Sequence, residues 1–170
     1  MIKIRTEPKR DISAIYDINF QAFGQAAEAI LIDQLHQKNA IILSLVAEEK
    51  KEIVRHILFS PVHVHSGENI YERVGLGPMA VLPECQRTGI GSLLVEKGLV
   101  LLRERGCGFV VVLGHPEYYP RFGFVPGSRF DLTYEYDVPD ELFMALELQK
   151  GVLQKIFDLV KYQPEFNEVE

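Results

Sequence analysis

Cysteine is scarce in this chain of 170 residues, which contains only Cys85 and Cys107. The two form no Cys-x-x-Cys pair and lack the spacing of metal ligands, which excludes the common zinc and dithiol redox motifs. Low cysteine usage without a disulfide framework is typical of a reducing compartment. We therefore expect a cytoplasmic protein.

Long apolar runs are absent as well. Uninterrupted apolar segments such as FVVVL at 109–113 are far shorter than the roughly 20 residues that span a bilayer. The N-terminal sequence MIKIRTEPKRD has no apolar segment of the kind found in secretion signals. We therefore expect neither a leader peptide nor a membrane partner.

Positive charge is in deficit. Lys and Arg number 18 against 24 Asp and Glu, which gives a formal net charge of -6. Non-specific binding to nucleic acid or to anionic membranes rewards a basic surface, so this balance argues against both. It leaves room for a small anionic ligand, which needs only a local site.

What remains is an ordinary globular composition. Hydrophobic residues make up 47% and charged residues 25% of the chain, close to the average for folded soluble proteins. The length suits one domain over residues 1–170 and is large enough to bury a core. The polar, acidic C-terminal segment at 163–170 is expected to fray.

Hydrophobic periodicity predicts alternating strands and helices. Asp11 stands where the N-cap of the first helix is expected. The order indicates an α+β or α/β domain with a mixed sheet. Strands are predicted at 2–5, 41–49, 52–65, 69–83, 107–114 and 143–148, helices at 11–23, 26–37 and 90–105, and short turns or helices at 115–124 and 150–160.

The segment PECQRTGIGSLLVEKGL at 83–99 places a Gly-x-Gly loop directly before an amphipathic helix. Glycines let backbone approach a ligand closely, and the first N–H groups of a helix form an anion site. Arg87 can add charge-assisted hydrogen bonds, so the segment favours a pyrophosphate ligand. A tight turn without a ligand is the alternative. The dinucleotide pattern G-x-G-x-x-G and the P-loop pattern are both unmatched, which argues against a nucleotide enzyme of another α/β fold.

Two motifs carry a resemblance to a known family. Val81, Pro83, Gln86, Gly89 and Gly91 follow the pattern V-x-P-x-x-[QR]-x-x-G-[IL]-[GA], and this segment resembles motif A of the GNAT superfamily of acyl-CoA N-acyltransferases. Downstream, VVVLGHPEYYPRFGF resembles motif B of that family, a buried strand followed by Y-x-x-x-G-F. The phrase LGHPEYYPRFGF is also similar to a branch of predicted N-acetyltransferases, and the resemblance covers residues 71–148.

The resemblance implies a fold and an activity. The fold would be a mixed, mostly antiparallel sheet flanked by helices, with one pair of parallel strands that splay apart. Acetyl-CoA would lie in that opening and donate its acetyl group to a primary amine. The residues that the resemblance assigns to acetyl-CoA binding are Met79, Ala80, Val81, Gln86, Arg87, Thr88, Gly89, Ile90, Gly91 and Ser92.

The same resemblance suggests how protons are handled. Tyr119 matches the tyrosine of motif B and would protonate the leaving thiolate, although tyrosines in such a segment can also serve packing alone. Many relatives carry a glutamate on the strand before the phosphate loop, but no carboxylate lies between Arg73 and Val81. His115 is a candidate base because histidine titrates near neutral pH. A turn histidine, a water-mediated route, or no dedicated base are the alternatives.

Histidines at 56, 63 and 65 allow a metal site to be imagined. Such a site needs three or four convergent ligands, and a solvated strand face is the simpler interpretation. We expect acetyl-CoA as co-substrate and no metal.

The acceptor is open. Polyamines, amino acids, aminoglycosides, protein N-termini and lysines all fit, so a small-molecule or peptide amine is expected, and a homodimer is compatible with the sequence. The alternative function is a non-catalytic acyl-CoA-binding sensor or regulatory module. It would keep the phosphate loop, and the missing strand carboxylate favours it, whereas Tyr119 in register argues against it.

Overall fold

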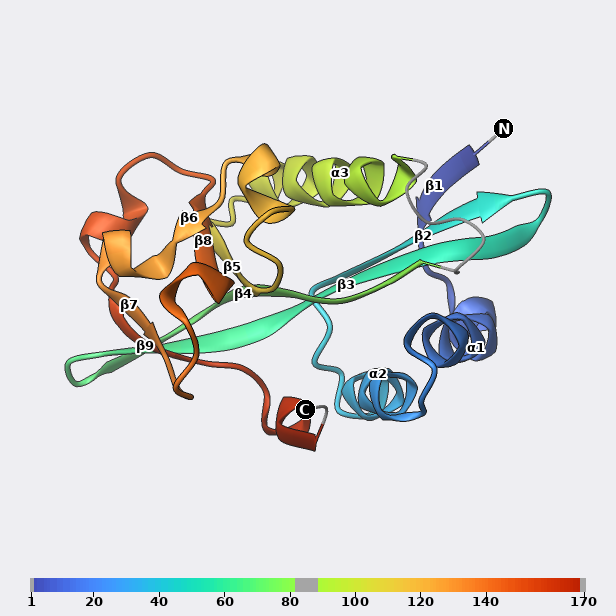
Figure 1. Cartoon of the computed structure of the whole chain (residues 1–170), viewed down its shortest axis with the longest axis horizontal. Helices are drawn as coiled ribbons and strands as arrows, with labels where there is room; N and C mark the ends of the chain where they lie inside the picture. Colours follow the sequence, from blue (N-terminus) through green and yellow to red (C-terminus); the bar gives the residue numbers. More distant parts are fainter. Residues whose placement is uncertain (1, 82–88, 169–170) are drawn as a thin grey trace. The chain divides into compact units, whose positions relative to one another are not determined.

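The structure is a computed structural model that describes residues 2–81 and 89–168 (Figure 1). It contains two compact units: residues 1–59, 78–98 and 164–170 form unit 1, and residues 60–77 and 99–163 form unit 2. The described helices are α1 (Ile12–Phe23), α2 (Ala27–Gln37) and α3 (Ile90–Glu104). The described strands are β1 (Ile2–Thr6), β2 (Leu43–Glu49), β3 (Glu52–Ser66), β4 (Asn69–Val81), β5 (Phe109–Leu113), β6 (Val125–Pro126), β7 (Leu132–Tyr134), β8 (Phe143–Glu147) and β9 (Asp158–Lys161).

The strands form a mixed, mostly antiparallel sheet, as predicted. Within the described residues its order is β1-β2-β3-β4-β5-β8-β6, with β9 beside β3 and β7 beside β9. The expected parallel pair is β4 and β5. A second, short parallel pairing joins β7 to β9 and was not predicted.

The first three strands of unit 1 form an antiparallel meander. Strand β1 pairs with β2, and β2 pairs with the first half of β3. Lys50 and Lys51 connect β2 to β3 with φ angles of 52° and 68°. Positive φ at both central residues is the geometry of a tight hairpin turn that matches the twist of its strands. The two lysines, which lie between the predicted strands 41–49 and 52–65, therefore form the hairpin turn.

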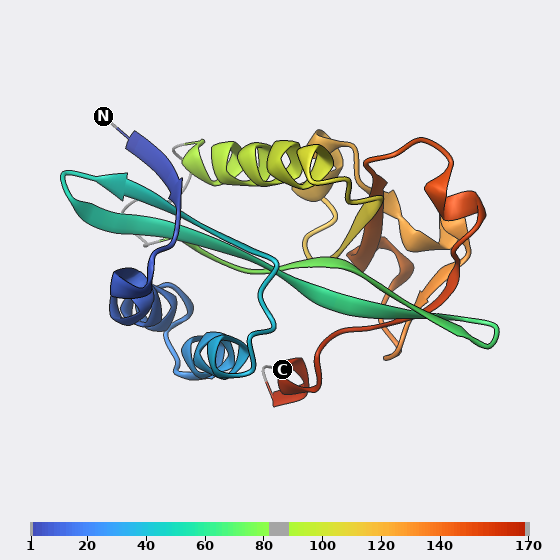
Figure 2. The same ribbon diagram turned by 180° about the vertical axis from the view of Figure 1, so that it is seen from behind.

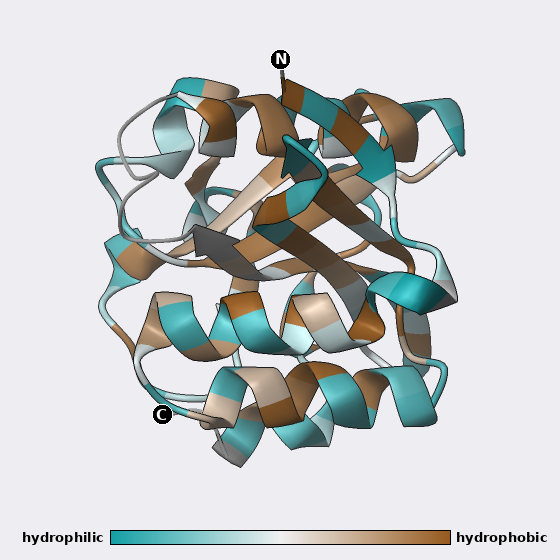
Figure 3. Cartoon of the chain, turned by 90° about the vertical axis from the view of Figure 1, so that its right-hand side faces the viewer, coloured by the Kyte–Doolittle hydropathy of each residue, from teal (hydrophilic) through white to brown (hydrophobic). Residues whose placement is uncertain are grey.

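Helices α1 and α2 lie side by side against one face of this meander (Figures 1 and 2). Brown and teal alternate along the helical ribbons in Figure 3, which reflects one apolar and one polar face per helix. Their apolar faces contribute to one buried cluster. Its members are Ile15 of α1, Leu31, Ile32 and Leu35 of α2, Ala40, Val46 of β2 and Leu58 of β3.

A buried polar network runs beside that cluster. Asn19 of α1 lies with its Nδ2 2.9 Å from the Ile15 carbonyl oxygen and 3.2 Å from His56 Nδ1. Because the amide nitrogen is a donor, Nδ1 of His56 accepts and its proton sits on Nε2. His56 Nε2 lies 2.8 Å from Ser44 Oγ, and that hydroxyl donates to Glu7.

His36 of α2 completes the network. Its Nδ1 lies 3.0 Å from the Ile32 carbonyl oxygen, and its Nε2 contacts the Glu7 carboxylate. Both ring nitrogens thus face acceptors, which favours the doubly protonated imidazolium. Hydrogen bonding to Glu7 raises the pKa of His36 despite partial burial. The burial of Glu7 raises the pKa of its carboxyl, but hydrogen bonds from His36 and Ser44 outweigh this, and the net pKa is lowered.

His56 corrects a sequence-based expectation. The side chain is fully buried rather than part of a solvated strand face, and burial lowers its pKa to about 4. His63 and His65 are half-buried on the part of β3 that pairs with β9. Within the described ranges, no three or more His, Cys, Asp or Glu side chains gather as a metal site.

Asp11 stands at the N-cap of α1, as predicted, but its side chain makes no capping hydrogen bond. The carboxylate instead pairs with Arg5 of β1, which also donates from Nη2 to Glu48 Oε2 at 2.7 Å. The backbone of Asp11 has helical φ and ψ angles of -88° and -7°, whereas a capping residue is usually extended, and its carboxylate is held by the Arg5 guanidinium instead.

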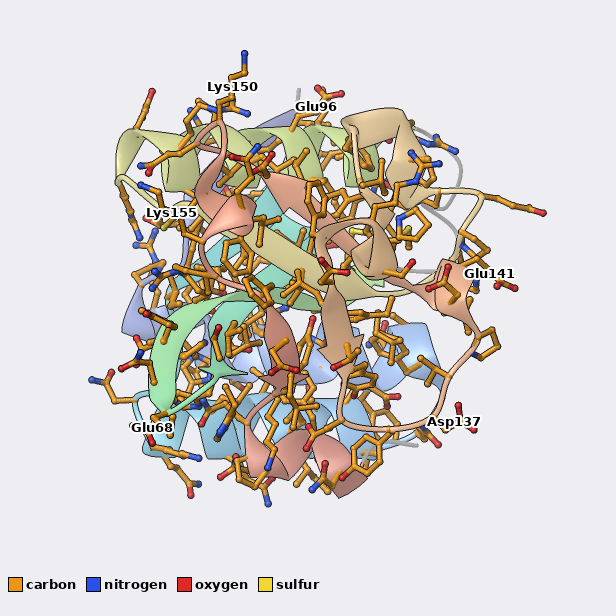
Figure 4. All side chains as sticks on the ribbon, turned by 90° about the vertical axis from the view of Figure 1, so that its left-hand side faces the viewer. Glu68, Glu96, Asp137, Glu141, Lys150 and Lys155 are labelled. Carbon is orange, nitrogen blue, oxygen red and sulfur yellow. The ribbon has the colours of Figure 1, made fainter. Side chains whose placement is uncertain are left out.

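The first half of α3 packs closely on β3 in unit 1. A Cβ at Gly98 would lie 2.5 Å from the ring of Phe59, so glycine is required for this approach. Leu94 and Val95 are fully buried, whereas Glu96 points away from the ribbon in Figure 4. The predicted amphipathic helix is confirmed, and Gly106, at φ 81°, follows its C-terminus.

The C-terminal segment differs from the expected frayed tail over its described residues. Residues Pro164–Glu168 form a 3-10 helix, η7. Within unit 1, Phe166 packs on the cluster of α1 and α2, and Lys38 Nζ lies 3.1 Å from Glu165 Oε2. An aromatic anchor in a polar sequence accounts for this packing.

Unit 2 is centred on β5. Four of its five residues are buried, as predicted for a strand covered on both faces, and it pairs with β4 on one side and β8 on the other. The segment 150–160, expected as a short helix or connector, contains a 3-10 turn and then strand β9. No helix among the described residues is both long and apolar enough to cross a membrane.

Candidate functional site

The end of β4 and the start of α3 bracket the predicted pyrophosphate loop. Met79 is half-buried on β4, and Ala80 and Val81 complete that strand. Gln86, Arg87 and Thr88 lie outside the described residues. The structure therefore describes both ends of the loop, and the positions of these three side chains stay predictions.

Gly89 forms the junction between the loop and α3. Its φ is 81°, a left-handed conformation that other residues adopt only with strain, and no atom lies within 4 Å of the place where a Cβ would stand. The Gly89 carbonyl accepts from Leu93 N–H at 3.3 Å, which closes the first helical turn. Ile90 and Gly91 belong to that turn, where N–H groups have no partner within the helix. An anion fits this end of the helix.

The parallel pairing of β4 and β5 ends early. Its last pair is Leu76 and Val112, although β4 continues to Val81 and β5 to Leu113. Gly77 follows with a φ of 135°, which only glycine adopts readily.

Tyr162 lies against the last paired residues and was not identified from sequence. Its hydroxyl is 3.3 Å from both the Leu76 and the Val111 carbonyl oxygens. The side chain is buried, and burial raises its pKa well above the usual value. It follows the apolar β9, so the alternation of that strand was the signal available, but the sequence assigned it to a polar tail.

Tyr119 sits in a closely fitted place after β5. It begins the 3-10 helix Tyr119–Phe122 (η3), and its ring packs against Gly114, where a Cβ would collide with it. The ring also makes an edge contact with Phe124 at a centroid distance of 5.8 Å. Burial raises the pKa of Tyr119 to about 12, with a smaller contribution from Tyr118. The hydroxyl is therefore protonated at neutral pH.

Tyr118 has a different environment. The Arg121 guanidinium stands 4.5 Å from the centroid of its ring, and Arg121 Nε donates to the Tyr118 carbonyl at 2.9 Å. The side chain is half-buried. These contacts are those of a packing residue.

His115 lies in the turn that precedes Tyr119. Its side chain is exposed, and its carbonyl accepts from Tyr118 N–H at 3.1 Å. No described residue forms a hydrogen bond with its ring. The structure groups His115 and Tyr119 in unit 2, and Met79 with Gly89–Ser92 in unit 1.

The model of the acetyltransferase (GNAT) family matches residues 10–124. Among curated proteins, the uncharacterized N-acetyltransferase YhbS of Escherichia coli K12 is 33% identical over 165 residues, which cover 96% of this chain and 98% of YhbS. The uncharacterized N-acetyltransferase YjhQ of the same organism is 38% identical over 137 residues, which cover 78% of this chain and 75% of YjhQ.

Solved structures agree with these matches. The crystal structure of Escherichia coli YhbS in complex with CoA superposes with a TM-score of 0.93 at 31% identity, covering 99% of this chain and 93% of that one. A GNAT family acetyltransferase from Brucella melitensis in complex with acetyl-CoA gives a TM-score of 0.80 at 34% identity, covering 98% of both chains. Motif matches, sheet topology and relatives over the full length agree, and the chain belongs to the acetyltransferase (GNAT) family.

Proposed function

We propose that the protein transfers the acetyl group of acetyl-CoA to a primary amine. The observation that carries this proposal is the junction of β4 and α3, where left-handed Gly89 turns the chain into a helix whose first turn can hold an anion. The structural relatives with bound CoA and acetyl-CoA support the choice of ligand.

The binding residues fall into two groups. The backbone of Met79 and Val81, on either side of Ala80, would pair with the pantetheine amides, as an added strand pairs with a sheet edge. The backbone N–H groups from Arg87 to Ser92 would surround the pyrophosphate, and the Arg87 side chain would add a charge-assisted bond. The protein's net charge of -6 does not oppose this, because the site's charge is local.

The reaction is a direct transfer. The amine nitrogen attacks the thioester carbonyl carbon and forms the C–N bond, and the tetrahedral intermediate then breaks its C–S bond. The nitrogen loses one proton and the sulfur gains one, so no redox partner is needed. The enzyme must orient two substrates, stabilise an oxyanion and move these two protons.

Tyr119 is assigned to the leaving sulfur. Its raised pKa of about 12 keeps the hydroxyl protonated, which a donor requires. A free thiol has a pKa near ~8.5, so complete transfer of the tyrosine proton to the thiolate is uphill. The role that this acidity favours is a hydrogen bond to the developing thiolate, which stabilises charge in the transition state.

His115 is assigned to the attacking amine. An exposed imidazole next to the η3 segment can accept a proton on a ring nitrogen and pass it to water. A water-mediated route without His115 stays open, because no carboxylate of β4 between Arg73 and Val81 can serve.

Location and partners complete the proposal. The described Cys107 is a free thiol, which is compatible with a reducing, cytoplasmic location. The acceptor is a small-molecule or peptide amine, and a homodimer is compatible with the chain.

The test is an assay of purified protein with acetyl-CoA and a panel of amines, with released CoA thiol as the readout. The panel holds polyamines, amino acids, aminoglycosides, and peptides with free N-termini or lysines. Thiol release above the amine-free background with at least one class is the expected result. Acetyl-CoA binding without turnover on any amine would instead identify a non-catalytic acyl-CoA-binding module.

A further inference from the structure

Arg55 is a cation enclosed in unit 1. It is one of the largest fully buried side chains among the described residues, with a relative exposure of 1%. Arginine is rarely buried to this extent, because removing a charge from water is costly. The reaction described above makes no use of this guanidinium.

Arg55 lies on the face of β3 that α3 covers. Phe59 is on this face, because its ring lies 2.5 Å from the place of a Cβ at Gly98 of α3. The pairing of β2 with β3 is regular from Phe59 to Arg55, and residues at even spacing share one face of a strand. His56 lies on the opposite face, where it contacts Asn19 of α1.

The first turn of α3 lies over Arg55. In Figures 1 and 2, α3 begins over the end of the meander where β3 begins. From Gly98 back to Ile90 the helix covers ~12 Å, and from Phe59 back to Arg55 the strand covers ~13 Å. Because Gly98 packs on Phe59, these similar distances bring Arg55 beneath the first helical turn.

The neighbouring strand leaves room for this long side chain. Ala47 of β2, which has only a methyl group, is paired with Arg55. The next residue of β2, Glu48, is paired with Ile53, so Val54 is an extra residue of β3 and forms a β-bulge. Bulges redirect side chains and are frequent beside functional sites. The regular ladder from Phe59 therefore ends at Arg55.

Arg55 stands at the end of α3 that is ordinarily unfavourable for a cation. The N-terminal end of a helix carries partial positive charge, and cations are favourable at the C-terminal end instead. Above Arg55, left-handed Gly89 and the first turn of α3 form the anion site described above. A buried charge is poorly screened by water, so its field reaches this turn. An anion bound there is attracted by the helix end and by the guanidinium.

We propose that Arg55 is a positioning residue for acyl-CoA, whose buried charge draws the pyrophosphate to the first turn of α3. It acts through the interior of unit 1, by its electrostatic field, and does not need to touch the ligand. The inference rests on the proposed function, because that function places the pyrophosphate at this turn.

The experiment measures the affinities for CoA and dephospho-CoA by calorimetry. Both ligands contain the pyrophosphate, and dephospho-CoA lacks only the 3′-phosphate. Arg55→Met removes the charge and keeps a long side chain in the interior, a replacement that buried charges often tolerate. It should weaken the binding of both ligands by a similar factor of about 10. Arg55→Lys keeps the charge and should bind both ligands within about 3-fold of the unchanged protein.

The matched control is Lys51→Met, which removes an exposed cation in the turn before β3. Water and salt screen that charge, so neither affinity should change by more than about 2-fold. Thermal unfolding establishes that each variant is folded. If Arg55→Met does not fold, the lysine variant decides alone, and a folded Arg55→Lys that binds CoA more than about 10-fold more weakly overturns the inference.

Other outcomes also decide. Unchanged affinity of Arg55→Met for CoA would contradict the proposal, and so would a lysine variant as weak as the methionine variant, because the charge would then not be what acts. Weakening of CoA alone would assign Arg55 to the 3′-phosphate. An equal effect of Lys51→Met would assign the result to net charge. If the unchanged protein binds neither ligand, the proposed function itself fails.

Discussion

Burial gives single side chains properties that their sequence positions do not reveal. Burial raises the pKa of Tyr119 to about 12 and lowers that of His56 to about 4. Both shifts have the same cause, because an apolar surrounding disfavours whichever form is charged. Tyr119 is thereby a proton-bearing donor, and His56 a neutral link in a hydrogen-bonded chain.

Tyr119→Phe should lower kcat about 10-fold and leave the KM for acetyl-CoA nearly constant. The ring keeps its packing on Gly114 and Phe124, while the donor to the thiolate is lost. General-acid assistance is typically worth ~10²- to 10⁴-fold, and a hydrogen bond without full proton transfer accounts for a smaller effect. Steady-state kinetics with released thiol as the readout measures both constants.

Tyr118→Phe is the control for this substitution, because its ring contact with Arg121 does not need the hydroxyl. It should leave kcat within about 2-fold of the parent value. An unchanged kcat for Tyr119→Phe between about pH 6 and 9 would show that the thiolate leaves without help from this tyrosine.

For single residues, the sequence predicted where a side chain stands along the chain better than it predicted which residues that side chain contacts. The register of Tyr119 and Gly89 followed from local motifs, because their roles depend on neighbours in the chain. Tyr162 and His56 could not be assigned, since their partners are 51 to 86 and 12 to 37 residues away. Long-range contacts of this kind leave no periodic signal.

For helices and strands, a strong periodicity of apolar residues was sufficient to predict where each element lies. Helices α1, α2 and α3 and the longer strands lie where apolar spacing predicts them. The strands β6, β7 and β9 were missed because they have 2, 3 and 4 residues, too few to show alternation. Each exists only because a partner strand accepts its hydrogen bonds, which is a property of the fold.

Gly89→Ala tests the junction between β4 and α3. No atom lies within 4 Å of the added Cβ, so the main cost is the φ of 81°, about 1 kcal/mol of unfolding free energy. The Tm should fall by about 2–4 °C. The KM for acetyl-CoA should rise several-fold, because the methyl stands where backbone approaches the pyrophosphate.

Gly67→Ala is the matched control, since Gly67 also has a positive φ, of 61°, and open space around its Cβ position. It should lower the Tm by a similar amount without changing the KM for acetyl-CoA. If both variants keep the parent KM, Gly89 serves the turn geometry alone and the pyrophosphate does not approach it.

For the whole molecule, the network of Glu7, His36 and His56 makes unfolding depend on pH in two opposite ways. The pKa of His36 is raised in the folded protein, so its contribution is complete below pH 6.5 and is lost as pH rises through the folded value. The pKa of Glu7 is lowered, so its contribution is present above pH 4.5 and is lost as pH falls through the folded value.

His36→Gln should therefore cost most between about pH 5 and 6, where both partners are charged. The expected loss there is about 1.5–3 kcal/mol of unfolding free energy, the range for a hydrogen bond to a charged group. Urea denaturation of both proteins from pH 5 to 9 measures it. The difference should shrink toward high pH, and a constant difference would show that the imidazolium is not the stabilising form.

The pKa of His56 is shifted in the opposite direction from that of His36. Its folded pKa of about 4 lies below the ordinary value of 6.5, so between these values the unfolded chain takes up a proton that the folded chain does not. Stability falls with falling pH over this window, by roughly 3 kcal/mol in total. A proton on Nδ1 would also face the Asn19 amide group 3.2 Å away, where two donors would meet.

His56→Gln removes this titration while keeping a polar side chain in the network. The unfolding free energy of the parent should fall between pH 6.5 and 4.5 more steeply than that of the variant, by about 1 kcal/mol per pH unit. The difference between the two proteins cancels the titration of the other acidic groups, which both share. Parallel pH profiles would mean that His56 is protonated in the folded state. His56 would then be a cation within the hydrogen-bonded chain that joins Asn19 to Glu7.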